Sequence, residues 1–94
     1  MTDATVVTRT FRIINEKGLH ARASARFVEV VEAHDALATV SRDGMEVSGD
    51  SIMGLLMLGA SKGTTIEVRT EGAAAAKLAD ALDALVANRF GEEY

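Results

Sequence analysis

The chain has 94 residues, a formal net charge of −4, and neither cysteine nor proline. A chain of this length accommodates one domain over residues 1–94, and the lack of cysteine excludes disulfides and thiolate metal sites. The net negative charge argues against a nucleic-acid partner, because neutralising the phosphates of a nucleic acid requires clustered lysine and arginine. Residues 1–4 show no signal-peptide pattern, and the apolar run 52–60 is too short to cross a bilayer. We therefore expect a cytoplasmic, monomeric domain with no membrane association.

Hydrophobic periodicity divides the chain into four short strands and three helices. The first strand is rich in β-branched residues and places Phe11 and Ile13 on one side. The pair Asp43-Gly44 is a type I′ turn signal that joins two strands into a hairpin. The expected order is strand 6–14, helix 21–34, strands 36–41 and 45–47, helix 51–58, strand 65–70 and helix 73–88. Helices placed between strands in this way favour a two-layer α+β sandwich.

Each helix carries apolar residues at helical spacing, which predicts the side that faces the core. These residues are Phe27, Val28 and Val31 in the first helix, Leu55 and Leu58 in the second, and Leu78, Ala81, Leu82 and Leu85 in the last.

The segment 18–28 places a histidine and an arginine where a loop becomes a helix. His20 stands at the helix N-terminus, where free backbone N–H groups and the positive end of the helix dipole favour a bound anion. Arg22 follows two residues later and offers charge-assisted hydrogen bonds to phosphate oxygens. A nucleophilic imidazole beside an anion site is typical of a phosphate-accepting histidine, so we predict His20 as acceptor and Arg22 as the group that stabilises the phosphate.

This segment resembles the active-site motif of the HPr family, the histidine-containing phosphocarriers of the bacterial phosphotransferase system. The family motif Gly-Leu-His-x-Arg-Pro-Ala is matched by Gly18, Leu19, His20 and Arg22, and the chain departs from it at Ala23 and Ser24. Alanine gives up the stiffness of proline but favours helix, so we expect a slightly looser turn with the chemistry intact. The resemblance continues through 43–44, 49–55, 58–59 and 63–64 and covers nearly all of residues 8–90.

The resemblance implies a four-stranded antiparallel sheet covered on one face by three helices. It further implies a phosphocarrier that takes a phosphoryl group from phosphorylated Enzyme I, on Nδ1 of the histidine, and donates it to an Enzyme IIA-type domain. No cofactor and no autonomous enzymatic activity are expected. The replacement of Pro-Ala, together with Glu29 and Glu32 where sugar-transport members tend to carry lysines, favours the nitrogen-related proteobacterial branch over sugar transport.

The short helix 51–58 is apolar nearly all the way round, so one side of it should remain exposed. Met53 and Leu56 are expected to form the exposed patch, with Ile52 and Met57 at its margins; the resemblance makes this patch, together with Ala25, the docking surface for Enzyme I and Enzyme IIA. Ser51 is expected to cap this helix. It also falls on the family's regulatory serine, which an HPr kinase/phosphorylase modifies in some bacteria.

Two other classes of function compete with the carrier. One is a regulatory protein-binding module that acts through Ser51 and the apolar patch without phosphotransfer. The other is a small ligand-sensing α+β domain of ferredoxin-like type, which leaves the motif at 18–22 unexplained. His34 lies near a helix C-terminus and is expected to be structural, and two histidines without a carboxylate cluster predict no metal site.

Overall fold

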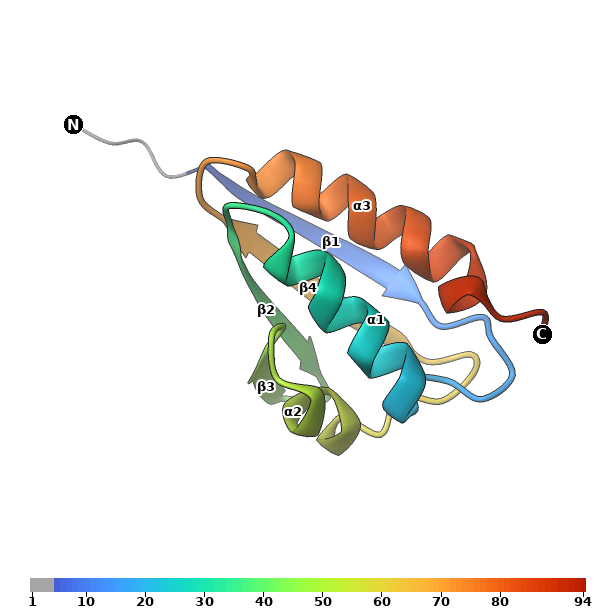
Figure 1. Cartoon of the computed structure of the whole chain (residues 1–94). Helices are drawn as coiled ribbons and strands as arrows, with labels where there is room; N and C mark the ends of the chain where they lie inside the picture. The colour runs from blue at the N-terminus through green and yellow to red at the C-terminus, as the bar shows by residue number, and fades with distance from the viewer. Residues whose placement is uncertain (1–4) are drawn as a thin grey trace.

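The computed structural model describes residues 5–94, which form one antiparallel sheet and one layer of helices (Figure 1). The elements in chain order are β1 (Val6–Arg12), α1 (Ala21–Glu32), β2 (Leu37–Arg42), β3 (Met45–Ser48), α2 (Ile52–Met57), β4 (Thr65–Glu71), α3 (Ala75–Ala87) and a final 3₁₀ turn, η1 (Arg89–Gly91). The predicted α+β sandwich and its element order are confirmed. The 3₁₀ turn η1 was not predicted.

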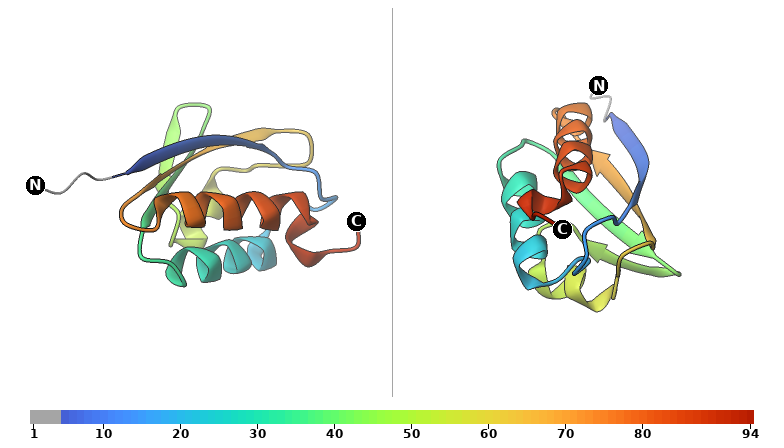
Figure 2. Two further views of the ribbon diagram at one scale, coloured as in Figure 1. Left: turned by 90° about the horizontal axis from the view of Figure 1, so that it is seen from above. Right: turned by 90° about the vertical axis from the view of Figure 1, so that its right-hand side faces the viewer.

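The sheet has the strand order β1-β4-β2-β3, and every neighbouring pair is antiparallel. All three helices lie on the same side of it, and Figure 2 shows the sheet and the helix layer edge-on. Asp43 and Gly44 both adopt positive φ, of 50° and 82°, as the predicted type I′ turn between β2 and β3 requires. The first strand ends at Arg12 rather than at residue 14, and the chain beyond it turns toward the start of α1.

The core fills the space between the sheet and the three helices. Phe27, Leu55 and Leu78 are all fully buried in it. The prediction for the last helix was partly right: Leu78 and Leu82 are fully buried, and Leu85 is half-buried against the core. Ala81 is only half-buried, whereas Ala79 and Val86, which were not predicted, are buried. All of these residues are apolar, so periodicity could not decide which of them face the sheet and α1.

Two loops meet at the end of the molecule where α1 begins. The backbone N–H of Leu19 donates to the carbonyl of Ala60, at 2.9 Å, which links the loop before α1 to the loop after α2. Gly18 has a φ of +65°, and a Cβ at this position would lie 2.6 Å from the Ala60 carbonyl oxygen. The close approach of the two loops therefore requires a residue without a side chain.

Candidate functional site

His20 is the N-cap residue of α1, as the sequence predicted. Its backbone is extended, with φ −77° and ψ −176°, and its carbonyl accepts the first helical hydrogen bond from Ser24 N–H at 2.8 Å. Its side chain makes no capping bond to the helix. The imidazole is therefore free to face other groups while it stands beside the unpaired N–H groups of the first turn.

The two departures from the family motif are both buried at the start of α1. Ala23 is buried among the apolar core residues, and Ser24 is fully buried. The Ser24 hydroxyl donates to the Leu19 carbonyl at 3.3 Å. Serine thus adds a side-chain hydrogen bond across the turn that holds His20, which an alanine at that position could not make.

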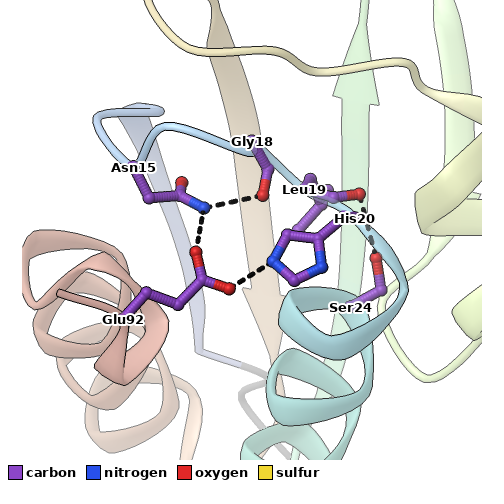
Figure 3. A network of polar contacts seen from close by, with 6 residues as sticks. All are labelled: Asn15, Gly18, Leu19, His20, Ser24 and Glu92. Atoms are coloured by element: carbon purple, nitrogen blue, oxygen red, sulfur yellow. Dashed lines mark hydrogen bonds and ion pairs between the residues drawn. The ribbon is translucent and has the colours of Figure 1, made fainter. Parts of the chain in front are cut away.

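A carboxylate from the far end of the chain meets the His20 ring (Figure 3). Glu92, just after η1, pairs through Oε2 with Nε2 of His20. Its other oxygen accepts a hydrogen bond from Asn15 Nδ2 at 2.9 Å, and the same nitrogen donates to the Gly18 carbonyl at 2.8 Å. The His20 and Glu92 side chains are 26% and 16% exposed, so this contact is partly shielded from water.

The C-terminal segment that carries Glu92 is itself attached to the loop before α1. The backbone N–H of Glu16 donates to the Tyr94 carbonyl at 3.0 Å. Glu92 therefore lies between two anchors, the turn η1 and the Tyr94 bond, which hold its carboxylate beside His20.

The environment of Glu92 lowers the pKa of its carboxyl group. Partial burial acts to raise this pKa, but the hydrogen bonds from Asn15 and His20 and the positive charges of His20 and Lys17 outweigh it. The ionised form is therefore the one that the folded site favours.

This shift predicts a pH-dependent contribution to stability. Because the folded pKa of Glu92 lies below the ordinary value of 4.5, its contribution is present above pH 4.5 and is lost as the pH falls through the folded pKa. Urea unfolding should show wild type more stable than Glu92→Gln at pH 7, with the difference shrinking toward pH 3. The exposed neighbour offers the control Glu93→Gln, for which a difference of equal size and pH dependence would contradict the prediction.

Arg22 lies in the first turn of α1 and lines a groove next to His20. The groove is bordered by the loop before α1, by α1 itself and by the C-terminal segment, and its lining residues are Glu16, Lys17, Arg22, Arg26, Gly91, Glu92, Glu93 and Tyr94. Arg22 is exposed and forms no ion pair within residues 5–94. Its guanidinium is thus available to an incoming anion.

The short helix α2 lies beside the beginning of α1 (Figures 1 and 2) and exposes apolar side chains. Met53, Met57 and Ile52 are 69%, 65% and 39% exposed. Leu56 is half-buried, so it lies at the margin of the patch rather than at its centre as predicted, whereas Met57 is among its most exposed members. Ala25, in the second turn of α1, is half-buried.

Ser51 caps α2, as predicted. Its Oγ accepts a hydrogen bond from the backbone N–H of Gly54 at 3.0 Å. We expect Ser51→Ala to lower the free energy of unfolding by about 0.5–2 kcal/mol, because that donor loses its partner. Urea unfolding measures the change, with Ser48→Ala as control, since the Ser48 hydroxyl bonds only the exposed Asp50 carboxylate. Equal effects of the two substitutions would contradict a capping role.

The second histidine is satisfied by its own helix. His34 Nδ1 hydrogen-bonds the Val30 carbonyl at 2.7 Å, which supports the structural role expected for it. Across residues 5–94 no group of three or more potential metal-ligating side chains occurs. No helix in this part of the chain combines the length and the apolar character needed to span a membrane.

Sequence reasoning missed Asn15 and Glu92. The one available signal for Asn15 was an amide directly after Ile13 and Ile14, where a buried polar side chain needs partners. Glu92 gave no signal, because an acidic pair close to the end of the chain is typical of a solvated tail. Only the folding of η1 against α1 brings that carboxylate to His20.

Comparison with known proteins identifies a consistent group of relatives. A family model described as "PTS HPr component phosphorylation site" matches residues 7–88. The phosphocarrier protein HPr of Cupriavidus necator is 44% identical over 93% of this chain and 98% of its own length. That of Neisseria meningitidis serogroup A is 42% identical over the same shares. The crystal structure of HPr-C-His from Thermoanaerobacter tengcongensis superimposes with a TM-score of 0.89 at 35% identity, covering 94% of this chain and 99% of that one.

Proposed function

Because this chain belongs to the HPr family of phosphotransferase-system phosphocarriers, we propose that His20 accepts a phosphoryl group from phosphorylated Enzyme I and donates it to an Enzyme IIA-type domain. One observation carries the assignment to His20: its partly exposed ring stands at the start of α1 without bonding the helix amides. We further propose that the protein acts in the cytoplasm, and that it is a carrier and not an enzyme with its own substrate pocket.

The first turn of α1 suits a transferred phosphoryl group. The free N–H groups and the positive end of the helix dipole attract the dianion that His20 acquires. The unpaired guanidinium of Arg22 adds charge-assisted hydrogen bonds from the adjoining groove. The His20 ring is partly exposed and these interactions are modest, so the phosphoryl group is held without being trapped.

The apolar patch on α2 provides a docking surface for both partners. Ile52, Met53 and Met57 are exposed beside α1, and Leu56 is half-buried at their margin. Ala25 of α1 is proposed as a further member of this docking surface. Methionine side chains adapt to different partner surfaces, which suits a carrier that must dock first on Enzyme I and then on Enzyme IIA.

Ser51 is proposed as a regulatory site for an HPr kinase/phosphorylase. Ser51 directly precedes Ile52, the first residue of the patch, and it is half-buried at the start of the helix that it caps. A phosphate there adds about −2 charge next to the patch and would disfavour docking of acidic partner surfaces.

Incubation with Enzyme I and phosphoenolpyruvate tests the carrier function. We expect one phosphoryl group per chain, labile in acid and stable in base as a phosphoramidate is, and mapped to His20 by fragmentation of the intact protein. Addition of an Enzyme IIA domain should remove it. No transfer to His20 from active Enzyme I would reject the carrier function and favour a binding module that acts through Ser51 and the patch.

A further inference from the structure

The contact between His20 and Glu92 bears on which ring nitrogen is available for chemistry. Nε2 is paired with the Glu92 carboxylate, and the other nitrogen, Nδ1, faces the first turn of α1 (Figure 3). An ionised carboxylate only accepts hydrogen bonds, so the ring nitrogen that contacts it must carry the proton. We propose that Glu92 is a positioning residue, which holds His20 in the Nε2–H tautomer and leaves the lone pair on Nδ1. This inference rests on the proposed function.

The directions of the two bonds made by Asn15 follow from the Gly18 carbonyl. The Gly18 carbonyl can only accept, so it fixes the NH₂ group of Asn15 toward it, and the second proton of that group points to Glu92 Oε1. Glu92 therefore receives one proton from Asn15 and one from His20. Asn15 thus holds the Glu92 carboxylate by a donated hydrogen bond, and that carboxylate accepts the proton on Nε2 of His20.

The same arrangement supports both directions of the transfer. In the forward step the Nδ1 lone pair forms the N–P bond, while the bond from phosphorus to the donor atom of Enzyme I breaks and its electron pair stays on that atom. The proton remains on Nε2, so the phosphorylated ring is a cation that faces the Glu92 carboxylate. In the onward step the N–P electron pair returns to Nδ1, and the ring leaves as neutral imidazole. No proton has to be moved.

Substitution of Glu92 by glutamine gives a distinctive expectation. Asn15 continues to present an N–H group, so the glutamine must turn its carbonyl oxygen to Asn15 and its NH₂ group to His20. Nε2 then has to accept a hydrogen bond from that NH₂ group. The ring proton therefore moves to Nδ1, which loses the lone pair needed to attack phosphorus. The isosteric Glu92→Gln should therefore impair transfer more than Glu92→Ala, which frees the ring to take either tautomer.

Two measurements on the full chain test this. The first is ¹⁵N NMR of the unphosphorylated histidine ring near pH 8, expected to show the proton on Nε2 in wild type, on Nδ1 in Glu92→Gln, and on both in Glu92→Ala. The second is the rate of phosphoryl uptake from Enzyme I. We expect it to fall about threefold to tenfold in Glu92→Ala and about a hundredfold in Glu92→Gln, since a carboxylate-to-amide change that reverses a catalytic histidine's tautomer costs up to about 10⁴ elsewhere. Glu71→Gln, with the same charge change at the exposed end of β4 and outside the groove, should match wild type in both.

The outcomes separate this inference from the carrier function. If wild type takes no phosphoryl group from active Enzyme I, the carrier function fails, while the NMR result still decides the tautomer. If wild type is phosphorylated but Glu92→Gln keeps the proton on Nε2, or transfers as fast as Glu92→Ala, the positioning role is overturned. Circular dichroism and urea unfolding of each variant verify that the fold is retained, and Glu92→Gln preserves the shape of the side chain.

Discussion

His20→Ala should reduce phosphoryl uptake from Enzyme I to below detection, the largest functional effect expected of any single substitution here. A methyl group offers no lone pair to phosphorus, and the neighbouring hydroxyl of Ser24 is fully buried and bonded to Leu19. The fold should persist, because the substitution removes only one partly exposed hydrogen bond to a carboxylate, worth about 1.5–3 kcal/mol. Phosphorylation followed by intact-protein mass spectrometry measures the loss, and urea unfolding measures the stability.

The second histidine supplies the matched control. His34 is also part-buried and also bonded to a single acceptor, the Val30 carbonyl. His34→Ala should keep the full level of phosphorylation, with a loss of stability of about 0.5–1.5 kcal/mol because its partner is a neutral carbonyl. If His20→Ala still accepted one phosphoryl group with a phosphoramidate's acid lability, His20 would not be the acceptor.

Gly18→Ala should produce the largest loss of stability among substitutions in the motif. At a φ of +65° a left-handed backbone costs an alanine about 1–2 kcal/mol. Its Cβ would also lie 2.6 Å from the Ala60 carbonyl oxygen and 2.9 Å from Ser61 Cα, and such overpacking adds about 1–3 kcal/mol. The sum, about 2–5 kcal/mol, is a large part of the roughly 5–10 kcal/mol expected for a domain of this size.

Gly59→Ala separates the two contributions. Gly59 has nearly the same dihedral, φ +60°, but nothing lies within 4 Å of the position where a Cβ would be added. It should therefore lose only the backbone cost of about 1–2 kcal/mol. Urea denaturation of both variants gives the comparison. Equal losses would show that the approach of the Gly18 loop to Ala60 is not tight. Gly18→Ala should also slow phosphoryl uptake, because displacing this loop moves His20.

Most of the fold could be predicted from short stretches of sequence, because each signal depends on residues a few positions apart in the chain. The turn at Asp43-Gly44 needs two residues that tolerate positive φ, and the cap at Ser51 needs a hydroxyl three residues before a free N–H. The placement of His20 at the start of α1 likewise follows from where the helical periodicity begins. The prediction for α3 was incomplete for the opposite reason: alanines and other apolar residues lie on several sides of this helix, so Ala79 and Val86 could not be recognised as buried from the pattern alone.

What the sequence determined by itself was therefore the strands and α-helices, their order and the histidine at the start of a helix, since these follow from contacts between residues a few positions apart. The tertiary structure alone decided what surrounds that histidine. Glu92 lies 72 residues from His20 along the chain and Asn15 lies 77 from Glu92, so no periodicity or turn signal relates them. Their meeting depends on how α3 and η1 pack against α1, and that packing determines which nitrogen of His20 carries the proton.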